Sequence, residues 1–270
     1  MATLTMPRRA WVEQVMGLPV SIHLRGPGVR DGWVADAVAA AYDELRAVDA
    51  LFSTYRADSE VSRVNAGDLR LADAHPMLRE VAALCDEAVD RTDGCFDARL
   101  PSPHGGTWWD PSGVVKGWVT DRVAARLSRL GGHDVSVNAG GDLALAPGRP
   151  DSTPWRIGID DPDHPGRMLT VVAVCVGGVA TSGTAARGRH IHDPRTGEPA
   201  DGGLVAVTVA GPDPAWAEVW SKVLFLGGRD AIRAEARARG LAAWWVREDG
   251  ELEMTAAARA LTIWVGTEAA

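Results

Sequence analysis

The 270-residue sequence has few of the residues that mark a disulfide-bonded, metal-bound or membrane-spanning protein. Its three cysteines, Cys85, Cys95 and Cys175, are odd in number and widely spaced. They provide neither a disulfide framework nor a cysteine metal quartet, so we expect free thiols. No apolar run approaches the roughly 18 residues that a membrane span requires.

Positive charge is also scarce, because the formal net charge is −8. Nucleic acid or an anionic membrane is therefore not expected as a general partner, and an anionic small ligand would need cations supplied locally. The first nine residues include the basic pair Arg8 and Arg9 but no apolar segment behind it and no cysteine for lipidation. We expect no export signal and a cytoplasmic location.

The length suits a single domain over residues 1–270. Three segments in the first half have apolar residues at helical spacing. The expected helices cover residues 31–52, 76–93 and 116–130, with inward stripes at Val34, Val38, Ala41, Leu45, Val48 and Phe52, at Met77, Val81, Leu84 and Ala88, and at Val119, Val123, Leu127 and Leu130.

The second half is richer in short apolar runs bounded by glycine or proline, which is typical of strands. We expect strands at 134–138, 142–146, 155–160, 169–176, 204–209, 241–246 and 261–265, and helices at 214–226 and 229–239. Residues 11–24 fit two short strands or one bulged strand. Because helices and strands are grouped and do not alternate regularly, the α+β class is favoured.

Two polar clusters interrupt the helical first half. The segment Phe52–Arg56 contains Tyr55, one of only two tyrosines. Its ring can stack on a base or a flavin, although a helix end followed by a turn capped at Ser59 explains the same segment. Residues 110–117 surround a helix start, where free N–H groups, the helix dipole and Lys116 favour phosphate. The alternative is an ordinary helix cap with a surface lysine, and the spacing is not that of a Walker A loop.

Two glycine-containing segments stand out in the second half. Residues 138–142, Asn-Ala-Gly-Gly-Asp, join two expected strands, and a tight hairpin turn explains them as well as a ligand site does. Residues 181–197 concentrate hydroxyls, basic side chains, an acid, His190 and His192. This density favours a site. A Gly-x-Ser-x-Gly elbow of a hydrolase is absent, and the two histidines lack a third ligand at zinc spacing.

Taken in order, these segments resemble the ApbE family. The match begins at Met16-Gly17 and continues through Phe52-Ser53-x-Tyr55, Gly94-x-Phe96-Asp97, Asp110-x-x-Gly113-x-x-Lys116-Gly117, Asn138-x-Gly140-Gly141-Asp142 and Thr181-Ser182-Gly183. It ends with His190-Ile191-x-Asp193-Pro194-x-Thr196-Gly197. Each motif is short, but seven motifs in the same order make the resemblance specific.

The resemblance implies an α+β fold with mixed sheets flanked by helices, in two intimately packed lobes with the active site between them. It implies an FAD:protein FMN transferase, in which a Thr or Ser hydroxyl of an acceptor protein attacks the FMN-side phosphorus of FAD and AMP leaves. His190 would be the base, since an imidazole titrates in the required range. By the same resemblance the FAD-binding residues would be Met16, Tyr55, Cys95, Phe96, Asp97, Asp110, Lys116, Ser182, Gly183 and Ile191.

The sequence departs from the family pattern where the family has metal ligands. The family's Ala-Asp-x-x-x-Thr is here Ala217-Glu218-x-x-x-Lys222. Gly113 and Glu218 are candidate ligands for Mg²⁺, but a lysine offers no acceptor. On a solvent-facing helix, Glu218 and Lys222 would form an ordinary i, i+4 ion pair. If they face the site, the Lys222 ammonium replaces part of the metal's charge on the pyrophosphate, and the need for Mg²⁺ stays open.

Two other functions fit the same residues. Water in place of the acceptor hydroxyl gives an FAD pyrophosphatase, which releases FMN and AMP. A chain that kept the scaffold and lost the chemistry would be a non-catalytic FAD-binding protein.

Overall fold

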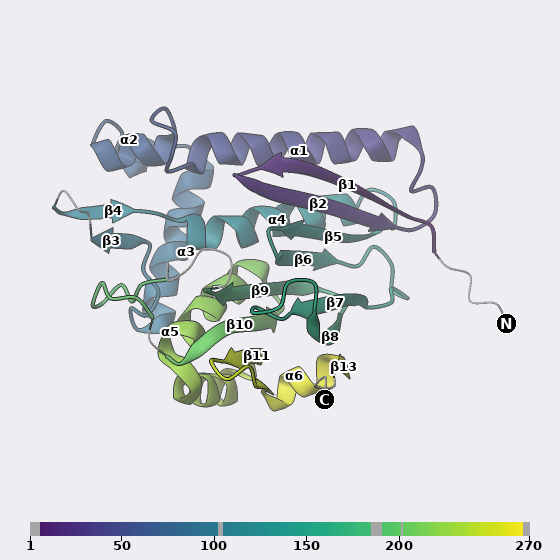
Figure 1. Ribbon diagram of the computed structural model, residues 1–270. Coiled ribbons are helices and arrows are strands. Elements are labelled where there is room, and N and C mark those ends of the chain that lie inside the picture. The colour runs from purple at the N-terminus through teal and green to yellow at the C-terminus, as the bar shows by residue number, and fades with distance from the viewer. Residues whose placement is uncertain (1–5, 102–104, 185–190, 201, 267–270) are drawn as a thin grey trace.

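The computed structural model describes residues 6–101, 105–184, 191–200 and 202–266. Its centre is an eight-stranded sheet (Figure 1). In order across the sheet, the strands are β1 (Arg8–Val15), β2 (Leu18–Arg25), β5 (Asp134–Ala139), β6 (Asp142–Ala146), β9 (Gly177–Gly183), β10 (Leu204–Gly211), β11 (Ala242–Arg247) and β12 (Leu252–Met254). All pairings between these described strands are antiparallel.

Helices cover one face of this sheet. Helix α4 (Ser112–Ser128) packs on β5 and β6, and α5 (Pro214–Arg239) packs on β9 and β10. Helices α1 (Gly32–Phe52) and α3 (Pro76–Thr92) contact α4 from outside. Shorter elements fill the end of this layer: α2 (Glu60–Ala66), the 3₁₀ turn η1 (Leu71–Asp73), and the hairpin of β3 (Arg99–Pro101) and β4 (Thr107–Trp109).

A small sheet lies on the opposite face of the main sheet. It contains β13 (Thr262–Val265), β8 (Met168–Val174) and β7 (Trp155–Asp160), with α6 (Ala256–Leu261) beside it. A second apolar core joins the two sheets, where Ile157 and Val172 pack with Trp244 of the main sheet. This arrangement, with helices on one side and a small sheet on the other, confirms the expected α+β class. No helix in the described ranges is long and apolar enough to cross a membrane.

The helix expectations hold best where the apolar spacing is regular. The α1 stripe is buried throughout. In α3 the predicted Val81 and Ala88 are buried, whereas Met77 and Leu84 are only partly buried and the next residues, Leu78 and Cys85, are buried in their place. Helix α4 begins at Ser112, four residues before the predicted start, and ends at Ser128. Leu130 therefore lies beyond the helix and is exposed, against prediction.

The predicted strands are present, and residues 8–25 form two strands joined by a two-residue turn. Strand β9 was not predicted because its glycines and hydroxyls are typical of a loop. One of its glycines makes room for α5, because a Cβ at Gly178 would lie 2.3 Å from the Cα of Pro214. The two helices predicted at 214–226 and 229–239 are both present within α5, because the backbone at Gly228 (φ 67°) is non-helical and separates them by a kink.

Candidate active site

A cleft of about 1450 Å³ opens at the end of the main sheet where the β1–β2 and β5–β6 turns lie. The ends of α1 and α4 and the first half of α5 bound one side, and β7 bounds the other. Its volume exceeds the roughly 300–1,000 Å³ of an ordinary small-molecule site, so it suits an extended ligand. Its lining includes the predicted residues Met16, Tyr55, Asp110, Gly113, Lys116, Ser182, Gly183, Ile191, Glu218 and Lys222.

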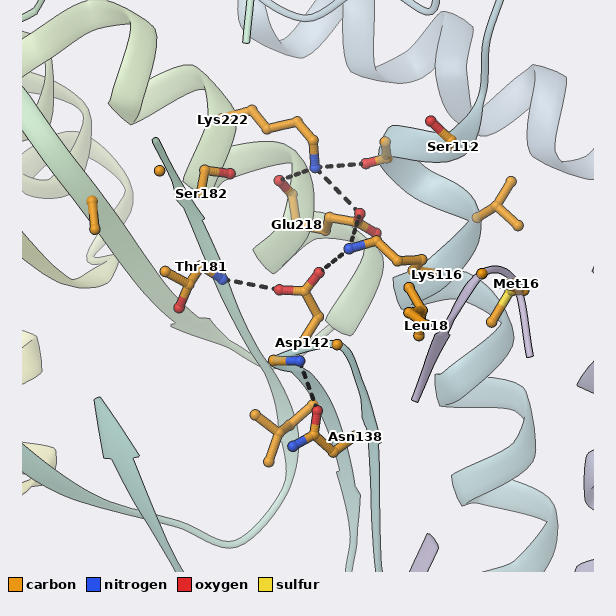
Figure 2. A pocket seen from close by; sticks show the side chains of 18 of the residues that line it. Met16, Leu18, Ser112, Lys116, Asn138, Asp142, Thr181, Ser182, Glu218 and Lys222 are labelled. Carbon is orange, nitrogen blue, oxygen red and sulfur yellow. Dashed lines mark hydrogen bonds and ion pairs between the residues drawn. The ribbon is translucent and has the colours of Figure 1, made fainter. Parts of the chain in front are cut away.

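The β1–β2 turn brings Met16 to the rim of the cleft (Figure 2). Both residues of this two-residue turn have positive φ, 55° for Met16 and 71° for Gly17. A two-residue hairpin favours this conformation, but a side chain other than that of glycine, Asn or Asp is unusual in it. Such backbone strain concentrates at functional sites, which is consistent with a ligand-facing role for Met16.

Tyr55 follows α1 and stands almost free of the protein. Tyr55 is 98% exposed and lines the cleft. Ser59 caps α2, because its side chain accepts a hydrogen bond from the N–H of Ser62. The capped turn predicted for this segment is therefore present, and it leaves the Tyr55 side chain exposed at the cleft.

The first turn of α4 faces the cleft. Pro111 precedes the helix, and Asp110 Oδ1 accepts a hydrogen bond from the N–H of Ser112 at 2.9 Å. Lys116 consequently lies in the second turn and not at the helix start. Gly113 has little room for a side chain, because a Cβ would lie 3.0 Å from the Phe96 ring and 3.3 Å from Cε of Lys222.

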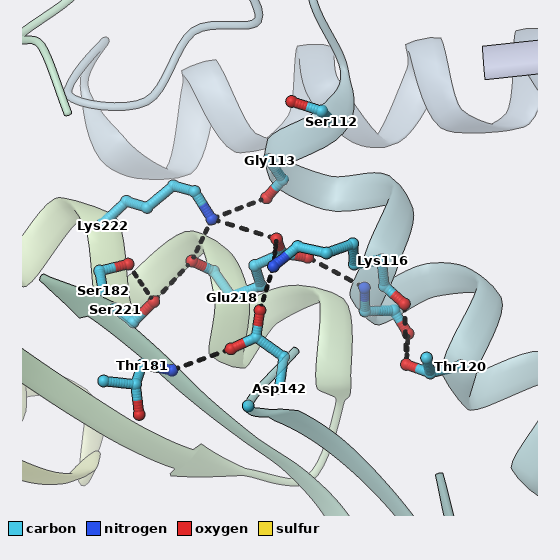
Figure 3. A network of polar contacts seen from close by, with 12 residues as sticks. Ser112, Gly113, Lys116, Thr120, Asp142, Thr181, Ser182, Glu218, Ser221 and Lys222 are labelled. Carbon is cyan, nitrogen blue, oxygen red and sulfur yellow. Dashed lines mark hydrogen bonds and ion pairs between the residues drawn. The ribbon is translucent and has the colours of Figure 1, made fainter. Parts of the chain in front are cut away.

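A buried ionic cluster forms the floor of the cleft (Figures 2 and 3). The Lys116 ammonium contacts Asp142 on β6 and lies 3.4 Å from Oε1 of Glu218 on α5. Asp142 Oδ1 also accepts a hydrogen bond from the N–H of Thr181 on β9 at 3.0 Å. Burial by itself lowers the pKa of Lys116, but Glu218 and Asp142 outweigh it and raise that pKa above its usual range. Lys116 is thus a permanent cation at the cleft floor.

Glu218 is the most enclosed charge of the cluster, at 1% exposure. Its Oε2 accepts a hydrogen bond from the N–H of Gly117 at 2.9 Å. Burial acts to raise the pKa of Glu218, but the ammonium groups of Lys222 and Lys116 and the Gly117 N–H outweigh it and hold that pKa below its usual value. The side chain is therefore a carboxylate at neutral pH.

Lys222 points into the cluster and not to solvent. Its ammonium lies 3.2 Å from Glu218 Oε1, 3.3 Å from the Glu218 carbonyl oxygen and 3.2 Å from the Gly113 carbonyl oxygen (Figure 3). The pair is therefore not an ordinary solvent-facing i, i+4 ion pair. Instead, the pair joins the start of α4 to α5.

Hydroxyl groups line the β9 side of the cleft. Ser182 Oγ lies 2.8 Å from Ser221 Oγ, which in turn donates to the Glu218 carbonyl oxygen at 2.9 Å. Thr181 Oγ1 pairs with Thr208 Oγ1 at 2.9 Å. These bonds tie β9 to α5 and β10 and fix the wall beside the ionic cluster.

The β5–β6 turn is the tight hairpin turn that its sequence allowed, and it also lies at the cleft. Gly140 and Gly141 have φ of 61° and 102°, and Asn138 Oδ1 accepts a hydrogen bond from the Gly141 N–H at 2.8 Å, which makes a tight hairpin turn. The same turn lines the cleft and delivers Asp142 to Lys116. Asp142 and Ser221 were absent from the predicted site residues. Asp142 could have been found from its position beside the Gly140-Gly141 pair, whereas nothing in the sequence around Ser221 indicated a site.

The segment Cys95–Asp97 lies apart from the cleft lining. Phe96 is buried and its ring packs behind Gly113. Burial raises the pKa of the Cys95 thiol, and Asp97 Oδ1 accepts a hydrogen bond from the Arg99 N–H at 2.8 Å. None of the three is among the described residues that line the cleft, so Phe96 supports the site from behind.

The predicted base, His190, lies outside the described residues. Its neighbour Ile191 is half-buried and lines the cleft. The following turn is formed as its sequence predicts, because Gly197 has φ of 76° and donates its N–H to the Asp193 carbonyl oxygen at 2.7 Å. His192 Nδ1 lies 3.1 Å from the Gly197 carbonyl oxygen, within this turn.

A divalent metal does not fit the described residues at this place. No cluster of three or more His, Cys, Asp or Glu suited to a metal occurs in the described part of the chain. The two predicted ligands, the Gly113 carbonyl oxygen and Glu218, both contact the Lys222 ammonium. Mg²⁺ requires oxygen ligands near 2.0–2.1 Å in octahedral geometry, and a cation already lies between these oxygens.

Comparison with known proteins agrees with this architecture. The Escherichia coli K12 protein named FAD:protein FMN transferase is 30% identical over 151 residues, which are 53% of this chain and 43% of that protein. A Vibrio cholerae protein of the same name is 32% identical over 138 residues, 48% of this chain and 41% of its own. These aligned segments span less than half the length of the curated relatives.

Solved structures are similar over almost the whole chain. The ApbE protein of Thermotoga maritima has a TM-score of 0.82 at 22% identity, covering 94% of this chain and 99% of its own. The Pseudomonas stutzeri flavinyl transferase ApbE, in its apo form, has a TM-score of 0.79 at 25% identity, covering 97% and 98%. The ApbE family model matches residues 16–102 and 98–245. The chain therefore belongs to the ApbE family.

Proposed function

We propose that this protein transfers the FMN part of FAD to a Ser or Thr hydroxyl of an acceptor protein. The observation that carries the proposal is the convergence of motifs from β1–β2, α4, β5–β6, β9 and α5 on one cleft around the Lys116 cation. The relatives named as FAD:protein FMN transferases and flavinyl transferase support the same chemistry.

The reaction is a substitution at phosphorus. The acceptor hydroxyl oxygen forms a bond to the FMN-side phosphorus of the pyrophosphate, and the bond from that phosphorus to the bridging oxygen breaks. AMP leaves with the bridging oxygen, and the hydroxyl proton passes to the base, for which we propose His190. The demands on the protein are in-line placement and neutralisation of phosphate charge.

The cluster supplies that neutralisation through Lys116. Its side chain is 26% exposed toward the cleft, while Asp142 and Glu218 hold its position from behind. A positioned cation in a partly desolvated site stabilises developing phosphate charge more than a mobile surface lysine would. We propose that Tyr55 and Met16 contact the ring systems, and that the wall at Ser182 and Gly183 lies beside the pyrophosphate.

Mass spectrometry tests the proposal directly. The protein is incubated with FAD and a flavin-acceptor domain, and both the intact acceptor mass and the nucleotide products are measured. A covalent FMN adduct with one AMP per adduct supports transfer. Free FMN and AMP without adduct would indicate a pyrophosphatase, and intact FAD would indicate binding alone; either result contradicts the proposal.

Variants at Lys116 and Arg70 separate the role of the cleft cation from a general loss of charge. Lys116→Met removes the cation and should lower the adduct rate by about 10²-fold or more, in the range measured for single charge-stabilising groups. Arg70→Gln removes a positive charge from an exposed pair with Asp73. It should leave the rate unchanged, because exposed ion pairs contribute little.

A further inference from the structure

The two lysines of this chain meet in one place. Lys116 and Lys222 are the only lysines in 270 residues, and every other residue among the 28 lysines and arginines is arginine. Both ammonium groups contact the same carboxylate, that of Glu218 (Figure 3). A lysine ammonium is a compact charge with three donors, whereas a guanidinium is a wide planar fork. The site therefore uses the small cation in a chain that otherwise uses the large one.

The three donors of Lys222 match three oxygens of the protein. These are the Gly113 carbonyl, the Glu218 carbonyl and Glu218 Oε1, all at 3.2–3.3 Å. Together they form an oxygen cage made of two backbone carbonyls and one carboxylate. Such oxygens suit a hard divalent ion, but at about 2.0–2.6 Å. The observed separations are those of weak ammonium hydrogen bonds and leave no space for an ion among them.

We propose that the Lys222 ammonium is a built-in replacement for a divalent cation, so that the protein binds its phosphate ligand without a metal at this cage. Glu218 and Asp142 are buried carboxylates beneath the cleft, and unneutralised they would repel an anionic ligand. Lys222 and Lys116 supply one positive charge for each of them. The inference rests on the proposed function only for the identity of the ligand as FAD.

Side-chain length and packing support the assignment. Lys222 is held along its stem, since its Cε lies beside Gly113, where a Cβ would approach to 3.3 Å. Its side chain is 25% exposed, and Lys222 lines the cleft. A ligand phosphate that enters there meets a cation fixed by both helices.

The first test measures metal binding without FAD and without an acceptor, so that its result is independent of the proposed function. Wild-type protein is dialysed against Mn²⁺, and bound metal is counted by electron paramagnetic resonance and elemental analysis. We expect no bound Mn²⁺ in the wild type. Lys222→Ser frees the three oxygens and adds a fourth, and should bind one Mn²⁺ per chain that Mg²⁺ displaces. Lys222→Met, which fills the space with an apolar side chain, is the matched control and should bind none.

The second test measures FAD affinity by flavin fluorescence in EDTA and in Mg²⁺. For the wild type we expect the same Kd within about twofold. For Lys222→Ser we expect Mg²⁺ to tighten FAD binding about tenfold, which corresponds to about 1.4 kcal/mol. Thermal melts of each variant check that it folds.

Three results would overturn the inference. One is a stoichiometric Mn²⁺ site in the wild type, and another is a tenfold loss of wild-type FAD affinity in EDTA. The third is a folded Lys222→Ser that binds no metal, since it would show that the three oxygens do not form a cation cage. If the wild type is metal-free but FAD does not bind at all, the proposed function fails and the cage assignment stands.

Discussion

Glu218→Gln is the substitution from which the structure allows the most detailed prediction. The side chain is 1% exposed and its two oxygens contact Lys222, Lys116 and the Gly117 N–H. Glutamine keeps the size but removes the charge, so Lys116 keeps Asp142 as its only carboxylate partner and Lys222 keeps only the Gly113 and Glu218 carbonyl oxygens. Removing one partner of a buried ion pair costs about 3–5 kcal/mol. Because both lysines are about one quarter exposed, we expect a smaller loss, about 2–4 kcal/mol of unfolding free energy at pH 7.

The pH dependence of the stability difference shows whether the charge of Glu218 causes this loss. The folded pKa of Glu218 lies below its usual 4.5, so the carboxylate stabilises the fold fully above pH 4.5 and ceases to do so as pH falls through the folded value. The difference between wild type and variant should therefore be largest near neutrality and shrink as the pH falls below 4.5. At about 2 °C per kcal/mol for a chain of this size, the variant should melt about 4–8 °C lower at pH 7.

Thermal and urea unfolding at pH 7 and at pH 3.5–5 measure both effects. Glu235→Gln, in an exposed pair with Arg239 on the same helix, is the matched control and should change the unfolding free energy by less than about 0.5 kcal/mol. If Glu218→Gln is as stable as wild type at pH 7, or if its deficit is the same at every pH, the ionic account of the cluster is wrong.

Three further predictions concern the surroundings of the cluster. Tyr55→Ala should leave the melting temperature unchanged, because the residue is 98% exposed. It should weaken FAD binding about tenfold in a flavin fluorescence titration, because ring stacking is lost, and an unchanged Kd would show that Tyr55 does not contact FAD. Gly117→Ala places a Cβ 2.6 Å from the Pro214 carbonyl oxygen and should cost about 1–3 kcal/mol in urea unfolding, whereas a neutral effect would mean that α4 and α5 can separate freely. Burial raises the pKa of Cys85 to about 12, so this thiol stays protonated and unreactive at pH 8. A thiol reagent should therefore modify the same number of cysteines in the folded wild type and in Cys85→Ser, and fewer modified cysteines in the variant would contradict this.

The fold could be predicted where local spacing alone decides the outcome. The α1 stripe is an example, because six apolar residues at three- and four-residue intervals define one face whatever packs on it. Strand β9 could not be predicted, since its glycines are explained by the close approach of segments later in the chain: Pro214 of α5 at Gly178, Gly211 at Gly177 and Val205 at Gly183. In α3, Met77 and Leu84 were predicted to be buried in place of their neighbours Leu78 and Cys85, because apolar side chains occupy both positions of each pair.

The candidate site follows the same division. The order of the family motifs along the sequence identified the turns and helices that meet at the cleft, and with them Gly113, Lys116 and Glu218. It could not decide whether the Glu218–Lys222 pair faces solvent or the site. That orientation depends on the contact of α4 and α5 over Gly117, whose missing side chain lets the two backbones touch. The partnership of Lys116 with Asp142 likewise depends on the β5–β6 turn reaching α4.

The charge balance of the cluster has a consequence for the speed of ligand capture. Two ammonium groups face two carboxylates, so the cluster has no formal net charge, while the whole chain carries −8. The net negative charge of the chain therefore repels an approaching dinucleotide, and the neutral cluster attracts it only at contact distance. Salt weakens this repulsion, since the Debye screening length is about 10 Å at 0.1 M salt and shortens as the ionic strength rises. Association of FAD followed by stopped-flow fluorescence should accelerate as ionic strength rises, the opposite of a site that steers its ligand by an excess of positive charge.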